Sequence, residues 1–285
     1  MWERDFIHED YYFLIRRKEI INMFKLDHQK TVEEISEFIR RVVKEAKALG
    51  IVIGLSGGVD SSLTAALCVQ ALGKSKVLGI TIPVNFTPQD DRDDAQDLAD
   101  KLGIETKNVN ISPIFKSFFQ TLKVNDKNQG KKIAMGNVLA RIRMIILYYY
   151  ANSKNYLVVG PSDRSEALIG FFTKYGDGGA DFYPCIHLYK TQMRELAIYL
   201  NVPRRIAYKP SSPQLYPGHK ATDEIPLDYN ELDPILFGLF DQNLSPKEVS
   251  RKTGTSITIL EDILHRFNRS KHKRTFPPTI NENVN

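Results

Sequence analysis

Short apolar runs alternate with helix-like segments along the first 160 residues of the chain. Four runs have the length of strands and lie at residues 51–55, 77–84, 105–111 and 156–160, the third being the weakest. Between these runs, apolar residues recur at helical spacing in segments 63–72, 93–103 and 137–152. Strands that alternate with helices predict an α/β fold, a doubly wound parallel sheet with helices on both faces.

The flanking regions carry different signals. Thr31 and Glu34 have the spacing of a capping box, which predicts a helix start after an N-terminal extension over residues 1–30. Residues 170–184 are glycine-rich and too irregular for a regular element, and residues 203–219 contain four prolines, which predict a loop. Short helices are expected at 190–200, 245–252 and 257–268. We therefore predict one domain over residues 31–285, including a basic C-terminal tail.

Composition narrows the class of protein only slightly. A net charge of +5 and a pI of about 9.0 suit a polyanionic small molecule or nucleic acid, and neither value decides between them. The two cysteines, Cys68 and Cys185, lack the spacing of a metal site or disulfide framework. The sequence has neither a run of 18 apolar residues nor a signal-peptide layout at its start, so a cytoplasmic protein without membrane contact is expected.

Candidate chemistry begins where the first predicted strand ends, in the sequence GLSGGVDSS at residues 54–62. A strand, a glycine-rich turn and a helix form a phosphate site, because the first helical amides lack partners and the helix dipole favours an anion. The segment matches neither GxxxxGK[ST] nor GxGxxG. Asp60 offers the oxygen ligand that Mg²⁺ prefers. The alternative is a helix start that uses Asp and Ser only as caps.

The pattern SGGxDS resembles the pyrophosphate loop of the ATP-pyrophosphatase enzymes, which cleave ATP between its α- and β-phosphates. The later segments NVLARIRM, GFFTKYGDGGAD, KPSSPQL, TDE and KHKRTFPP occur in the order typical of NAD synthetases. Over residues 31–280 the chain resembles that family. The resemblance implies a Rossmann-like fold of the adenine nucleotide alpha-hydrolase type. It also implies that ATP, deamido-NAD and ammonia give NAD, AMP and pyrophosphate.

The resemblance also implies roles for individual residues. The expected ATP contacts are Gly54, Leu55, Ser56, Gly57, Gly58, Val59, Asp60, Ser61, Pro161, Lys190 and Ser212. The expected deamido-NAD contacts are Arg141, Lys174, Asp181, His272 and Lys273. Mg²⁺ is assigned to Asp60 and Glu166, and direct roles in the reaction to Asp60, Lys190 and Asp177. Pro161 stands where the family usually has threonine, so that hydrogen bond is lost.

Each feature has a simpler interpretation. Arg141 could belong to a solvated helix face, and Glu166 could be a first-turn acid favoured by the helix dipole. The segment YGDGGAD could be a surface turn, and RSKHKR a solvated tail or nucleic-acid patch. Two other functions stay open: amidation of a different carboxylic acid, and nucleotide binding without catalysis.

The family also implies assembly as a homodimer. No nucleic-acid or membrane partner is expected. Ammonia is the expected nitrogen donor, and a glutaminase on a separate chain stays open as its source.

Overall fold

The computed structural model describes residues 24–123 and 132–280. Contacts between residues divide the chain into two compact units. The first, called the sheet unit here, comprises the described residues of 26–164 and 172–224. The second, called the helical unit, comprises residues 24–25, 165–171 and 225–280. Residues 1–23, most of the predicted extension, lie outside the described residues, so the boundary at residue 31 stays a prediction.

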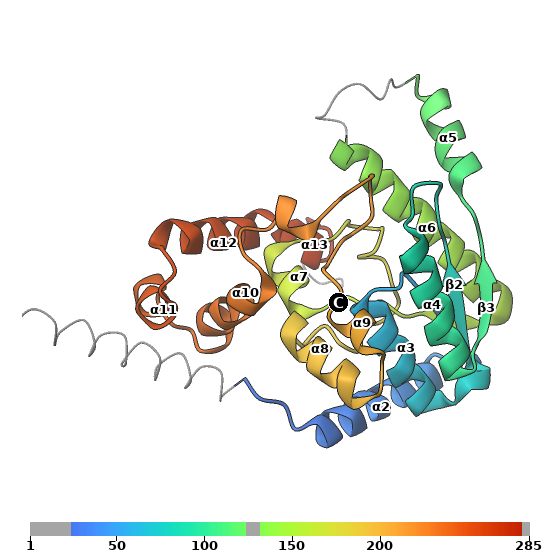
Figure 1. Cartoon of the computed structure of the whole chain (residues 1–285), viewed down its shortest axis with the longest axis horizontal. Coiled ribbons are helices and arrows are strands. Elements are labelled where there is room, and N and C mark those ends of the chain that lie inside the picture. Colours follow the sequence, from blue (N-terminus) through green and yellow to red (C-terminus); the bar gives the residue numbers. More distant parts are fainter. Residues whose placement is uncertain (1–23, 124–131, 281–285) are drawn as a thin grey trace, which may run out of the picture. The chain divides into compact units, whose positions relative to one another are not determined.

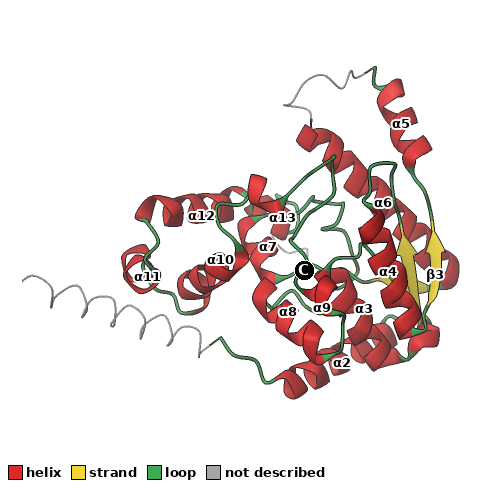
Figure 2. Cartoon of the chain, in the orientation of Figure 1, coloured by secondary structure: helices red, strands yellow, loops and turns green. Residues whose placement is uncertain are grey.

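The sheet unit is built on four parallel strands in the order β3-β2-β1-β4. Two of them, β2 and β3, lie side by side in Figure 1, and Figure 2 shows strands in yellow among the red helices. Their bounds are Gly50–Gly54 for β1, Val77–Thr81 for β2, Glu105–Asn108 for β3 and Tyr156–Val158 for β4. The predicted α/β class and all four predicted strands are confirmed. β2 is shorter than predicted because Pro83, which has no amide hydrogen, follows closely and cannot continue the strand.

Helices connect and flank these strands. Their bounds are His28–Glu45 (α2), Val59–Leu72 (α3), Gln89–Leu102 (α4), Ser112–Thr121 (α5), Lys132–Lys154 (α6), Lys190–Tyr199 (α8) and Arg204–Ala207 (α9), with short 3₁₀ turns at Lys74–Lys76 (η1) and Ala221–Asp223 (η3).

Side chains of β1 pack on opposite faces of the sheet. Ile51 and Ile53 join a core with Leu63 of α3, whereas Val52 joins a second core with Leu139 of α6. All of them are fully buried. A central parallel strand covered by helices on both faces is apolar along its whole length, which explains the continuous run at 51–53.

Two local predictions were wrong. α2 begins at His28 because the Asp27 carboxylate accepts a hydrogen bond from the amide of Lys30 at 3.1 Å, and Thr31 lies inside the helix. Asp27 thus supplies the N-cap that the capping-box pattern placed at Thr31, three to four residues too late. The second correction concerns residues 203–219, which are not loop throughout, since α9 forms one helical turn after Pro203.

The helical unit contains α7 and the C-terminal helices. Their bounds are Arg164–Ile169 (α7, whose first residue belongs to the sheet unit), Tyr229–Leu236 (α10), Phe237–Asp241 (η4, a π-helix turn), Pro246–Thr253 (α11), Ile257–Arg269 (α12) and Lys271–Arg274 (α13). The predicted cap of α11 is confirmed, because the Glu248 carboxylate accepts from the amide of Ser245 at 2.8 Å. Within the described residues, no helix is both long and apolar enough to cross a bilayer.

Candidate active site

The glycine-rich turn that follows β1 has a conformation that its sequence requires. Gly57 has a φ of +76°. A Cβ at this residue would lie 2.2 Å from the carbonyl oxygen of Asp91, at the start of α4. Both the backbone conformation and the close approach exclude a side chain at Gly57. Gly58 is the N-cap of α3 and has no side chain to cap it, so the first amides of α3 keep the character of an anion site.

Two serines hold the turn together through their hydroxyls. The Ser61 hydroxyl donates to the carbonyl oxygen of Gly58 at 3.2 Å and accepts from the amide of Ser56 at 3.2 Å. The Ser56 and Ser61 hydroxyl oxygens are 3.0 Å apart. Ser61 is buried and Ser56 is exposed, so the Ser56 hydroxyl is the one presented to solvent.

Lys190, the first residue of α8, lies beside this turn. Its Nζ is 2.7 Å from Oδ2 of Asp60 in the first turn of α3 and 2.7 Å from Oδ2 of Asp163 in the loop after β4. Lys190 and Asp163 are both fully buried. A buried ammonium is stable only when it is paired with opposite charge, and the two carboxylates provide that charge.

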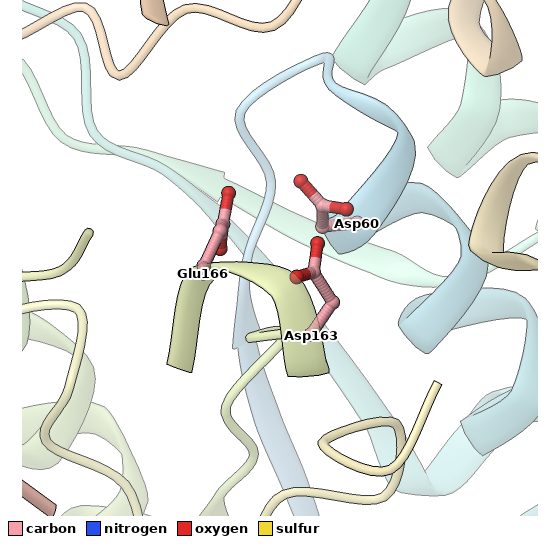
Figure 3. A group of neighbouring side chains, drawn as sticks. All are labelled: Asp60, Asp163 and Glu166. Atoms are coloured by element: carbon pink, nitrogen blue, oxygen red, sulfur yellow. The ribbon is translucent and has the colours of Figure 1, made fainter. Parts of the chain in front are cut away.

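Three carboxylates form a candidate metal-binding group (Figure 3). Asp60, Asp163 and Glu166 each offer one oxygen atom, and these oxygens lie within 4.8 Å of one another. Asp60 Oδ1 is buried and has no hydrogen-bond partner among the described residues. Oxygen-only donors around an unsatisfied carboxylate oxygen fit a hard divalent cation such as Mg²⁺. Asp60 and Glu166 are the two predicted metal ligands, and their binding of Mg²⁺ stays a prediction.

Asp163 is a member of this group that the sequence analysis missed. It follows β4, and β4 lies next to β1 in the sheet. In open parallel sheets, ligand sites form at the carboxyl ends of strands where the strand order reverses, which here is between β1 and β4. An acidic residue three positions before Glu166, just beyond that strand, was the signal that would have found it.

The glycine-rich segment around residue 175 folds back on α6. Arg141 of α6 donates from Nε and Nη2 to the carbonyl oxygen of Lys174, at 3.3 and 3.2 Å. The carboxylate of Asp177 accepts from the amide of Thr173 at 3.0 Å. The structure thus places three predicted residues, Arg141, Lys174 and Asp177, in one cluster of the sheet unit. Their contacts with a substrate stay predictions.

Asp181 anchors the end of this segment to the sheet. Its carboxylate accepts from the amide of Val158 in β4 at 2.7 Å and from the hydroxyl of Tyr148 at 3.0 Å. Burial, followed by the charge of Asp181, raises the pKa of Tyr148. Asp181 therefore has a structural role in addition to the substrate contact predicted for it.

The other predicted residues lie in different surroundings. The Ser212 hydroxyl donates to the carbonyl oxygen of His219 within one loop of the sheet unit, and Pro161 follows β4. In the helical unit, Nζ of Lys273 donates to the carbonyl oxygen of Gly170 at 2.8 Å, and Nδ1 of His272 lies 3.0 Å from the carbonyl oxygen of Arg269.

A family model described as NAD synthase matches residues 31–277. The chain belongs to the NAD synthase family. Among its relatives, the NH(3)-dependent NAD(+) synthetase of Hyperthermus butylicus is 46% identical over 257 residues, which cover 90% of this chain and 92% of that protein. The predicted family is confirmed, and with it a nucleotide-binding ligase of NAD biosynthesis that uses ATP as a substrate.

Solved structures of this family match the fold. The NMN synthetase of Francisella tularensis is 32% identical with a TM-score of 0.78, and the match covers 90% of this chain and 100% of that chain. The NH3-dependent NAD synthetase of Campylobacter jejuni, solved with a nitrate ion, is 30% identical with a TM-score of 0.75 and the same coverage. The fold of this NAD synthase family member therefore matches these two relatives over the full length of their chains.

Proposed function

We propose that this NAD synthase family member is an ammonia-dependent NAD synthetase that amidates the nicotinate carboxylate of deamido-NAD. One observation carries the proposal: the amide-rich turn at residues 55–58 lies directly beside the buried group formed by Lys190, Asp60 and Asp163. Anion-binding amides, a fixed ammonium and spare carboxylate oxygens are the parts needed to hold a nucleoside triphosphate with its cation.

The reaction has two covalent steps. In the first, a carboxylate oxygen of nicotinate bonds to the α-phosphorus of ATP, and the bond from that phosphorus to the oxygen bridging the β-phosphate breaks. Pyrophosphate leaves with the bonding electrons. In the second, the nitrogen of ammonia attacks the activated carbonyl carbon, AMP departs and a proton is released. Positioning and charge neutralisation suffice for both steps, so no side chain has to form a covalent intermediate.

Residues of the sheet unit have distinct parts in this scheme. The amides at the start of α3 and the Ser56 hydroxyl would hold the departing pyrophosphate, with the backbone from Gly54 to Ser61 lining its site. The Lys190 ammonium would offset phosphate charge. Asp60 and Glu166, with Asp163 beside them, would hold Mg²⁺. When bound, such a cation neutralises phosphate oxygens and makes pyrophosphate a better leaving group.

The remaining predicted contacts complete the proposal. Ser212 and the backbone at Pro161 would contact ATP. The deamido-NAD contacts are assigned to Arg141, Lys174, Asp181, His272 and Lys273, and a direct role in the reaction to Asp177. Four of these residues, Arg141, Lys174, Asp177 and Asp181, are clustered or anchored around the glycine-rich segment.

Assembly and location complete the functional proposal. We infer a homodimer in the cytoplasm. Exposed apolar side chains on α5 and α6 support it: Phe118 and Ile145 are 40% and 59% exposed, and Tyr149 is 66% exposed. Exposed large apolar side chains of this kind are available to an interface between subunits. Free ammonia would be the nitrogen source, with a separate glutaminase chain as the alternative donor.

A second candidate substrate is nicotinate mononucleotide, which carries the same nicotinate carboxylate. The F. tularensis neighbour, an NMN synthetase, favours it, since this chain covers all of that structure at 32% identity. The relatives with higher identity are named as NAD synthetases, and for this reason deamido-NAD is the leading substrate.

A competition assay tests the proposal. The protein is incubated with Mg-ATP, ammonium and equal amounts of deamido-NAD and nicotinate mononucleotide, and NAD, NMN and AMP are quantified. NAD should form in excess, with one AMP for each NAD. Predominant NMN would reassign the substrate, and AMP formed only with another acid would contradict the proposal. Asp60→Asn should lose most activity while the fold is retained, with a circular dichroism spectrum like that of the wild type.

A further inference from the structure

α7 is a helix too short to be stable without tertiary contacts, and it carries Glu166. Its first turn is fixed by a hydrogen bond inside the helical unit. The hydroxyl of Ser165, the residue before Glu166, donates to Oδ1 of Asp233 in α10 at 2.6 Å. Both side chains are fully buried, so breaking this hydrogen bond would leave a buried polar group without that partner, which is costly.

The other end of α7 is held by the C-terminal tail. Nη1 of Arg274 donates to the carbonyl oxygens of Ala167 and Leu168, at 3.0 and 3.3 Å. Nζ of Lys273 donates to the carbonyl oxygen of Gly170 at 2.8 Å. The last carbonyls of a helix have no partner within the helix, and cations are favoured at its C-terminal end. The tail therefore caps α7.

Arg274 is itself held in place for this contact. Its guanidinium lies 4.3 Å from the ring centre of Phe267 and donates to the Ser270 hydroxyl at 2.6 Å. Ser270 in turn packs against Gly170, where an added Cβ would lie 2.2 Å from the Cβ of Ser270. Gly170 has a φ of +69°, so only glycine allows both this turn and this contact. The end of α12 and the tail are thus fitted closely to the end of α7.

We propose that Arg274, assisted by Lys273, is a positioning residue that fixes α7 and thereby holds Glu166 in place for Mg²⁺. The tail then acts on the metal site by capping a helix, apart from any contact of its own with the dinucleotide. This inference rests on the metal role that the proposed function gives to Glu166. It predicts that a change at Arg274 alters the dependence on Mg²⁺ more than the affinity for deamido-NAD.

The test compares Arg274→Met with two other variants. Lys271→Met removes the same charge from an exposed side chain of the same short helix and serves as the matched control. Glu166→Gln removes the proposed ligand itself. Two readouts are taken: amide hydrogen exchange of the peptide covering residues 164–171 in metal-free protein, and steady-state kinetics at varied Mg²⁺ and varied deamido-NAD.

Arg274→Met should speed hydrogen exchange in that peptide and leave exchange in β1 unchanged. Loss of a residue that orients a metal ligand typically costs 10–100-fold, so the half-saturating Mg²⁺ concentration should rise by about tenfold or more. The KM for deamido-NAD should change by less than about twofold, because the substitution removes no proposed contact with that substrate. Lys271→Met should match the wild type in both readouts.

Distinct results would overturn the inference. A raised KM for deamido-NAD with an unchanged Mg²⁺ dependence in Arg274→Met would make the tail a substrate contact only. If Glu166→Gln alone shifts the Mg²⁺ dependence, the capping role fails while the proposed function stands. If Glu166→Gln does not shift it, the metal assignment fails as well. If Arg274→Met does not fold, Arg274→Lys serves instead, because it keeps the positive charge but lacks the planar guanidinium with its several N–H donors. This variant must show a smaller rise of the half-saturating Mg²⁺ concentration.

Discussion

Lys190 and Asp163 give the sharpest prediction, because they form a buried ion pair in the sheet unit. Lys190→Met removes the ammonium that pairs with the buried carboxylate of Asp163. Asp163→Asn removes the carboxylate and leaves the ammonium with Asp60, whose Oδ2 is 2.7 Å away. We predict that the double variant, Lys190→Met with Asp163→Asn, loses less unfolding free energy than the sum of the losses in the two single variants.

The magnitude follows from burial. Both side chains are 0% exposed, so solvent does not screen them and neither charge is stabilised by water once its partner is gone. Removing one partner of a buried pair costs about 3–5 kcal/mol. Asp60 keeps part of the compensation in Asp163→Asn, which puts that variant near the lower limit of about 3 kcal/mol. Because the double variant leaves neither charge alone, its loss should be about 1–3 kcal/mol smaller than the sum of the two single losses.

Urea unfolding of the four proteins, without ATP or metal, measures this coupling. The slope of unfolding free energy against urea must stay constant across the set, since a changed slope would indicate a changed native or denatured state. Losses that add to within about 0.5 kcal/mol would refute the reasoning, because contacting charges must couple. The same proteins separate stability from function: the double variant should lose less stability than the two single losses add up to, and it should still fail to form NAD.

Three further predictions concern other parts of the sheet unit. Gly57→Ala should lower kcat/KM for ATP by about a hundredfold through displacement of the turn. Gly73→Ala is the matched control, because Gly73 shares the positive φ (+81°) but an added Cβ there meets nothing within 4 Å, and this variant should keep its activity in the same assay. Burial above all raises the pKa of Tyr183 to about 12, so the native state keeps this proton longer than the unfolded state does. Stability should therefore fall as pH rises from about 10 towards 12, and urea unfolding of Tyr183→Phe should show a weaker fall. Burial also raises the pKa of both thiols, so Cys68 and Cys185 should resist alkylation at about pH 8 until the protein unfolds, as followed by mass spectrometry.

Periodicity predicted the sheet because the strands of a covered parallel sheet are apolar along their length and are separated by helical spacing. Two of the helices that escaped prediction, α10 and α5, did so for local reasons. α10 contains Pro234, a residue that usually ends a helix. None of the residues of α5 is fully buried, so its apolar side chains do not mark a core face.

The candidate site was predictable only where its residues are neighbours in sequence. The turn at 54–61 could be recognised because a phosphate site of this kind is one continuous segment. The position of Asp163 just after β4 marked it as a candidate, but its closeness to Lys190 could not be predicted from sequence because it depends on how the chain returns after β4. The tail was interpreted as a substrate contact because its charges were visible in the sequence, whereas the carbonyl groups at the end of α7 that accept its hydrogen bonds were not.

The absence of lysine from the turn after β1 has a physical explanation in the structure. A lysine within the turn would be a flexible, strongly hydrated cation at the surface. Here the ammonium comes from Lys190, 130 residues beyond Asp60, and is fully buried between two carboxylates. Such a cation is already ordered and desolvated before ATP arrives, so binding need not fix its side chain again. The turn is left to contribute amides and hydroxyls, which suits a site that must release pyrophosphate after each reaction.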